Sequence, residues 1–320
     1  EKAAFDKVTF KPIKSDPARV AALLAGDVDM IEAVPTTDIA RLKADGKVTL
    51  SSGVSNRVIY FYLDQYRENT PQVTAKDGSA IRNPFLDQRV REAVSLAINR
   101  QAIADRVMEG ASLPAGQLLP DGFFGTSSKI SAPAYNPTRA IQLLGEAGYS
   151  NGFKMVVHGP NDRYLNDAKI VEAVAQMLNR VGIEASVETL PRSVYFKRAS
   201  AGLDGEPEFT MGLVGWGSAT GEASSPLKSL IATFSKEKGL GASNRGRYSN
   251  AEVDALLAQA LATVDDAKRE ALLAKATEIS MGEIGIVPVH FQVNTWATRK
   301  GLAYTPRTDE YTLVRDVMVK

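Results

Sequence analysis

Short apolar segments in the first fifth of the chain predict alternating helices and strands. Alternation of apolar and polar residues predicts a strand over residues 7–13. Ser15 and Pro17 precede an apolar run, an arrangement typical of the capped start of a helix, here over residues 18–25. The elements expected next are an extended segment at 27–34, a helix at 37–44, an extended segment at 48–50 and a strand at 58–63.

A polar loop over residues 65–84 separates this region from a longer one. The order strand, helix, strand over residues 153–190 favours a parallel strand pair joined by a crossover helix. No repeat relates the two regions, so we expect two different α/β domains. The expected helices of the second region are 87–98 with a continuation to 107, 137–147, 165–181, 194–201, 251–263 and 266–281, and the expected strands are 153–158, 183–190, 209–214 and 286–291.

Composition excludes several functional classes. The chain has 320 residues, which at about 150 residues per domain also predicts two domains. Its 38 Lys and Arg against 37 Asp and Glu leave a net charge of +1, so no overall field attracts nucleic acid or an acidic membrane. The absence of Cys excludes disulfides, thiolate metal sites and cysteine nucleophiles, and two His leave little for zinc or triad chemistry.

Neither a membrane anchor nor an export signal is expected in this chain. The longest apolar stretches, such as residues 18–25 and 284–289, are far shorter than the roughly 20 residues that cross a bilayer. The first residues lack the basic and then apolar pattern of a signal peptide. The chain therefore has the features expected of a processed or truncated protein.

Enzymatic motifs do not fit the spacing of the sequence. The glycine-rich segment 215–221 follows a predicted strand, but Thr220 stands where the dinucleotide fingerprint needs its third small residue, and no P-loop is present. No Ser lies in a nucleophile-elbow pattern, and His158 and His290 are far apart in predicted strands. Asp27, Asp29 and Glu32 are spaced closely enough to form a carboxylate pair. They lie in a predicted extended segment, however, and are more simply explained as solvated surface side chains. We expect no catalytic residue, metal ligand or cofactor.

The turn after the strand 209–214 is the best candidate for a binding site. Trp216 offers a stacking face at a strand end, where ligands of open α/β sheets collect, although it is equally well explained as a core residue. Polar candidates in the same turn are Ser218, Thr220 and Glu222. Asn244, Arg245 and Arg247 are candidates for an anionic group of the ligand, and Arg192 and Tyr195, at the start of a predicted helix, complete the set.

Residues 83–100, NPFLDQRVREAVSLAINR, carry a family resemblance. They resemble the signature helix of the extracellular solute-binding proteins of family 5, the peptide, nickel and oligopeptide group of ABC importers. Supporting matches run in family order over nearly the whole chain, at residues 25–29, 135–137, 143–149, 181–183, 215–216, 248–250 and 253–254.

The resemblance implies an α/β clamshell like the type II periplasmic binding proteins, with peptide-binding-protein topology. Residues 1–60 and 286–320 would form part of an incomplete first lobe and 61–285 the second lobe, with hinges near Leu63 and Gly285. The strand at 286–291 would pair in the lobe that holds Val8. The chain would be the C-terminal portion of a longer receptor, and alone it would bind its solute poorly because one wall of the groove is missing.

The implied function is capture of a small solute between two lobes and its delivery to ABC permease subunits. The full-length protein would be a monomer, periplasmic or extracellular and membrane-tethered, with no nucleic-acid partner and no enzymatic activity. Peptide-binding relatives carry an Asp soon after Gly-Trp, whereas this chain has only the displaced Glu222, so the ligand class stays open among peptides, opines, glycosides and metal chelates. The alternatives are a carboxylate-dependent hydrolase, using Asp27, Asp29 or Glu222 with His290, and a chaperone-like binding surface.

Overall fold

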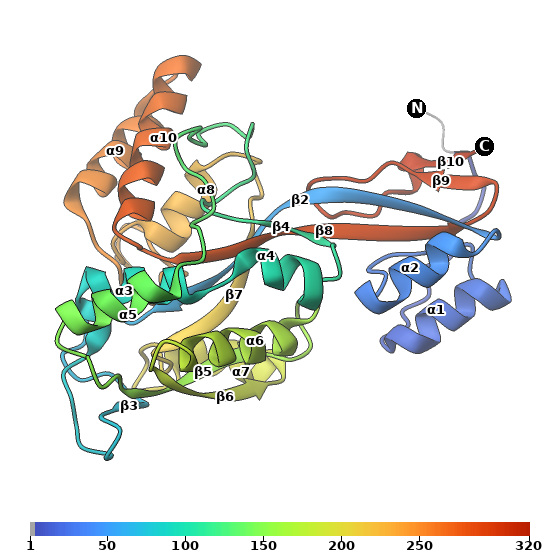
Figure 1. Ribbon diagram of the computed structural model, residues 1–320. Helices are drawn as coiled ribbons and strands as arrows, with labels where there is room; N and C mark the ends of the chain where they lie inside the picture. The colour runs from blue at the N-terminus through green and yellow to red at the C-terminus, as the bar shows by residue number, and fades with distance from the viewer. Residues whose placement is uncertain (1–3) are drawn as a thin grey trace.

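A long antiparallel strand pair connects two bodies of unequal size. The computed structural model describes residues 4–320. β2 (Val48–Leu63) and β8 (Val287–Arg299) run from the large body to the small body that holds α1 and α2 (Figure 1). They belong to an eight-stranded sheet with the order β1-β8-β2-β7-β5-β3, in which β4 also pairs with β8 and β6 with β5. The other strands of this sheet are β1 (Met30–Ile31), β3 (Val73–Thr74), β4 (Ser112–Pro114), β5 (Lys154–Pro160), β6 (Glu184–Leu190) and β7 (Met211–Gly217).

The large body has two hydrophobic cores, one on each face of the sheet. Successive side chains of a strand point to opposite faces, so β2 contributes odd-numbered residues 59–63 to one core and even-numbered residues 58–62 to the other. The first core is covered by α3 (Gln88–Ala97), α5 (Pro137–Glu146) and α6 (Asp167–Asn179). The second is covered by α7 (Arg192–Ala201), α9 (Ala251–Ala262) and α10 (Asp266–Gly282), with the short η3 (Leu227–Ile231).

The small body has its own core beneath two helices. Val20 and Leu23 of α1 (Asp16–Ala25) pack with Leu42 of α2 (Thr36–Ala44) and with Ala297 of β8. The Ser15 side chain caps α1, as its position before Pro17 predicts. The remaining elements are β9 (Leu302–Tyr304), which pairs with β10 (Val317–Val319), and the short segments η1 (Pro84–Leu86), α4 (Arg100–Ala102), η2 (Ile103–Val107), α8 (Ser224–Pro226) and η4 (Val314–Asp316).

Most predicted elements are confirmed, and one is wrong. β5 and β6 are parallel and are joined through α6, as the strand, helix, strand order indicates. The segments expected at 48–50 and 58–63 are parts of one strand, β2. The strand expected over residues 7–13 is absent, because no described strand lies beside this segment to pair with it, and Phe10 is 72% exposed. No helix within residues 4–320 is long and apolar enough to cross a membrane.

The boundary between the lobes stays a prediction. β2 and β8 pass without interruption from one body to the other, so the predicted borders at residues 60 and 286 fall beside or inside continuous strands. The pairing of β2 with β8 shifts register between Val54 and Val58 and again between Ile59 and Tyr60. This irregularity lies between the two bodies, closer to the small body than the predicted hinges at Leu63 and Gly285.

Candidate functional site

A groove of about 860 Å³ lies between the small body and the loop that follows β5. This volume is within the range of pockets that take small organic ligands. Segments distant in sequence line it, namely residues 14–19 at the start of α1, residues 32–38 before and within α2, residues 161–169 between β5 and α6, and single residues of β2, β8 and the C-terminal segment. The groove therefore exists only because β2 and β8 hold the two bodies next to each other.

Three cations in the groove, Lys14, Arg163 and Lys169, have no ion-pair partner within residues 4–320. Arg163 is exposed, and its guanidinium lies 4.9 Å from the centroid of the Tyr164 ring. Stacking on an aromatic face orients an arginine while its N–H edge remains free for a carboxylate. By contrast, Arg19 is bound to Asp16 at 2.7 Å.

The loop that presents Arg163 is held by a buried carboxylate. Asp167 accepts hydrogen bonds from the backbone N–H groups of Arg163 (2.8 Å), Tyr164 (3.0 Å) and Ala168 (2.9 Å). Burial nevertheless raises the pKa of the Asp167 carboxyl, because the loss of water outweighs these bonds. Tyr164 donates to the carbonyl of Gly215 in β7 at 3.1 Å, which ties the loop to the sheet.

An ion pair between β2 and the C-terminal segment forms part of the groove lining. The carboxylate of Glu310 accepts from Arg57 Nε at 2.9 Å and Ser55 Oγ at 2.7 Å, and both side chains of the pair are mostly buried. Burial alone would raise the pKa of Glu310, but the bonds and charge of Arg57 hold it below its ordinary value. Asn56 adds a bond from its backbone N–H to the Thr308 carbonyl at 2.9 Å, so the C-terminal segment is fixed against β2.

Trp216 lies at the end of β7 opposite Val58 of β2, and the groove does not include it. A Cβ added to the neighbouring Gly215 would approach the Tyr164 ring at 2.7 Å, so Gly215 faces the groove side of the sheet. Because strand residues alternate, Trp216 points to the opposite face, where it packs partly buried against the second core. Its buried Nε1 has no hydrogen-bond partner within the described part of the chain.

The polar residues after Trp216 mostly bond to one another and to α10. Ser218 is buried and its hydroxyl donates to the Glu222 carbonyl at 2.9 Å. The Glu222 carboxylate binds Arg269 of α10 and accepts from Ser224, so its charge is already compensated. Thr220 is exposed and lies with its hydroxyl 3.5 Å from that of Ser218.

Besides Ser218, two of the predicted ligand residues lie inside the protein. Tyr195 is fully buried, and its hydroxyl donates to the Leu213 carbonyl at 2.9 Å. Asn244 is also buried, and its amide donates to the carbonyls of Ala232 (3.1 Å) and Tyr248 (2.8 Å). These contacts give both side chains a structural role. Arg192 is exposed, and its backbone N–H donates to Asp162 of the groove at 2.6 Å.

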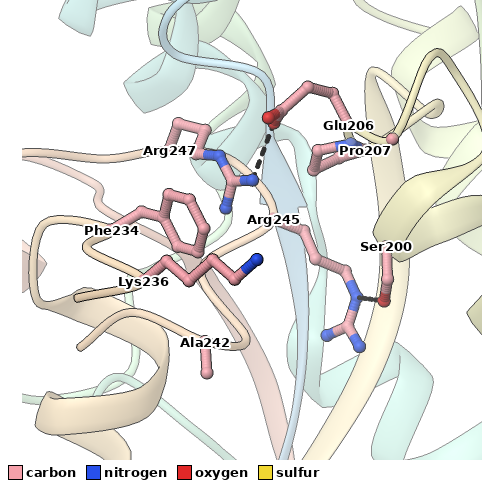
Figure 2. A pocket seen from close by; sticks show the side chains of 9 residues that line it. Ser200, Glu206, Pro207, Phe234, Lys236, Ala242, Arg245 and Arg247 are labelled. Carbon is pink, nitrogen blue, oxygen red and sulfur yellow. Dashed lines mark hydrogen bonds and ion pairs between the residues drawn. The ribbon is translucent and has the colours of Figure 1, made fainter. Parts of the chain in front are cut away.

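Arg245 and Arg247 do lie together, but in a second and smaller cavity (Figure 2). This cavity, of about 310 Å³, is formed by the end of α7, the loop before β7 and the segment 234–247. The predicted candidates therefore occupy separate places: the Trp216 turn, the core, this cavity and, for Arg192, the exposed start of α7. None lines the groove, whose residues Arg163 and Tyr164 the sequence interpretation missed.

No metal centre is suggested by the described residues. Within residues 4–320 no three His, Asp or Glu side chains come together in an arrangement that would hold a metal ion. The carboxylates Asp27, Asp29 and Glu32 do not form a catalytic pair. Asp29 is exposed and binds Arg299 at 2.6 Å, and Glu32 accepts from Thr312.

The sequence matches a family of solute-binding proteins, and the fold matches solved structures. Residues 1–237 match the family described as "Bacterial extracellular solute-binding proteins, family 5 Middle", and the chain belongs to this family. The α/β clamshell class is supported by solved structures that cover the whole chain: HbpA2 of Haemophilus parasuis (TM-score 0.79, 24% identity) and DppA of Helicobacter pylori with the peptide STSA (TM-score 0.82, 21% identity). The chain covers 59% and 58% of these two structures.

Curated relatives are named for different solutes. Heme-binding protein A of Haemophilus influenzae is 29% identical over 90% of the chain, and glutathione-binding protein GsiB of Shigella dysenteriae is 30% identical over 89%. The chain spans about half of their lengths, 49% and 52%. They are named as binding proteins rather than enzymes, which agrees with the prediction of a protein without catalytic activity.

Proposed function

We propose that the full-length protein is the substrate-binding component of an ABC importer. It captures a small solute between two lobes and delivers it to permease subunits in the membrane, acting as a monomer in the periplasm or tethered outside the cell. Membership of family 5 and the names of the relatives support this proposal. The two-body architecture and the groove between the bodies agree with it.

The solute carries at least one carboxylate, and Arg163 binds it. The observation that carries this proposal is the exposed guanidinium of Arg163, stacked on Tyr164 in a groove of about 860 Å³ with no internal counterion. Glutathione and the peptide bound by the Helicobacter protein are both carboxylates of suitable size. Trp216 and Thr220, which lie outside the groove at the end of β7, are proposed as a separate contact surface for the solute.

Calorimetric titration of the full-length protein with glutathione and with a tetrapeptide tests the assignment. Arg163→Gln should weaken binding by about tenfold or more, the usual effect of losing a hydrogen bond between charged groups. Arg180→Gln is the matched control, because Arg180 is exposed at the opposite end of α6 and lies outside the groove. Equal losses in both variants, or none in either, would remove Arg163 from the site.

The same titrations test the Trp216 surface and the alternatives. Trp216→Ala should also weaken binding, and unchanged affinity would show that the solute lies only in the groove. Hydrolysis of a bound peptide that a single carboxylate substitution abolished would replace the importer proposal with an enzymatic one. Binding of unfolded polypeptides without a saturable small-molecule site would favour a chaperone-like surface.

A further inference from the structure

The cavity of about 310 Å³ between α7 and segment 234–247 contains an excess of positive charge (Figure 2). Lys236, Arg245 and Arg247 line it, together with a single carboxylate, Glu206. Glu206 binds Arg247 at 2.7 Å and offsets one of the three positive charges. Two positive charges, on the exposed Lys236 and the half-buried Arg245, are therefore left without an ion-pair partner at this cavity.

Arg247 forms a fixed wall of the cavity. Its guanidinium stacks on Phe234, 3.7 Å from the ring centroid, and also donates to the Asn244 carbonyl at 3.1 Å. Its backbone has φ of 55°, a left-handed conformation that side chains other than Gly seldom adopt. Such strain persists only where surrounding contacts enforce it, and here they include the buried Asn244 amide, which bonds to carbonyls on both sides of the loop.

Arg245 is held differently and keeps its donors free. Its Nε donates to Ser200 Oγ at 3.2 Å, and its guanidinium lies 5.6 Å from the centroid of Phe196. The two terminal amino groups have no partner within residues 4–320, and neither has the ammonium of Lys236. In Figure 2 the ammonium end of Lys236 points toward the aliphatic part of the Arg245 side chain, and the Arg245 guanidinium lies on the side of Ser200.

We infer that Arg245 and Lys236 form a binding site for an oxyanion with two negative charges, a phosphate group. The planar fork of an arginine matches two oxygens of such a group, and the flexible lysine adds a third donor. Two uncompensated positive charges favour a dianion over a single carboxylate. This site shares no lining residue with the groove, so it is separate from the proposed solute site.

Phosphorus NMR of inorganic phosphate titrated with the 320-residue chain tests the site. We expect saturable broadening of the phosphate resonance, and acetate at the same ionic strength should not reverse it. Arg245→Gln should weaken the affinity for phosphate by about tenfold. Lys236→Gln should weaken it as well, whereas Lys238→Gln, an exposed lysine outside the cavity, should not. Thermal unfolding of each variant shows whether it is folded.

Two results would overturn the inference. One is the absence of saturable phosphate binding in the wild-type chain. The other is equal binding in the wild type and in folded Arg245→Gln and Lys236→Gln variants. Tighter binding of a phosphate monoester than of inorganic phosphate would support an organic phosphate as the ligand, and equal binding would support the free ion. No transported solute is needed, so failure of this test is distinguishable from failure of the importer proposal.

Discussion

His290 should make the stability of this protein fall steeply in mild acid. It lies in β8 between β2 and β4, fully buried, and neither ring nitrogen has a hydrogen-bond partner among the described residues. Burial lowers the pKa of His290 from 6.5 to about 3, because no nearby group compensates the charge of the protonated ring. The folded state therefore holds the neutral imidazole across the physiological range.

The sign and size of the effect follow from proton linkage. The pKa is lowered in the folded state, so between pH 6.5 and about 3 the unfolded chain binds a proton that the folded chain does not. The free energy of unfolding must then decrease as pH falls through this window. At pH 5 the difference amounts to about 2 kcal/mol, a large part of the stability of a typical domain.

His290→Leu removes this titration while filling nearly the same space with apolar atoms. It also removes two unpaired buried nitrogens, so the variant should be at least as stable as the wild type at pH 7.5. Urea unfolding followed by circular dichroism at pH 7.5, 6 and 5 measures the difference. The wild type should lose about 2 kcal/mol more than the variant between pH 7.5 and 5. Parallel losses in the two proteins would show that His290 is partnered, and the reasoning would fail.

The two remaining predictions concern the tryptophans and the Arg57–Glu310 ion pair. The chain has two Trp: Trp216 is half-buried, whereas Trp296 is 2% exposed and its Nε1 donates to Thr312. The Trp296→Phe variant keeps only the more exposed Trp216, so acrylamide should quench its fluorescence more strongly than that of Trp216→Phe. Equal quenching would contradict the placement of the two rings. Glu310→Gln should lower the free energy of unfolding at pH 7 by about 1–3 kcal/mol, because Arg57 loses its charged partner. Folding lowers the pKa of Glu310, so the stabilisation is complete above the ordinary pKa of 4.5 and is lost as pH falls through the folded pKa. Urea titrations that show the same difference between wild type and variant at every pH would refute this prediction.

Helix boundaries were predictable because their signals are local. Asn136 with Pro137, Asn250 and Asp265 each stand directly before a helix, and each side chain accepts a hydrogen bond from a backbone N–H of the first turn. Gly148 follows α5 with φ of 91°, the left-handed conformation that ends a helix. These contacts join residues within three positions, so neighbouring residues contain the required information.

Strand boundaries depend on partners that the local sequence does not contain. Ser51, Ser52 and Gly53 are weak strand formers, yet they belong to β2 because β8 pairs with them residue by residue. A Cβ at Gly53 would approach Pro306 at 2.6 Å, so the glycine permits the close approach of the C-terminal segment. Conversely, Phe10 lies in a good alternating pattern but has no described strand beside it. Pairing therefore overrides propensity in both directions.

The candidate site illustrates a further difference between residue type and residue environment. Asn244, Arg245 and Arg247 lie within four positions of the sequence, which predicts all three as ligand groups, yet their surroundings separate their roles. The buried amide of Asn244 is used up by backbone carbonyls, and Arg247 is neutralised by Glu206. Of the three, Arg245 keeps terminal donors without a partner in the described residues, as Arg163 does in the groove. In both cases an aromatic ring orients the guanidinium and no carboxylate contacts the guanidinium. A polar residue is available to a ligand when its own chain leaves it unsatisfied, and that property is set by tertiary contacts.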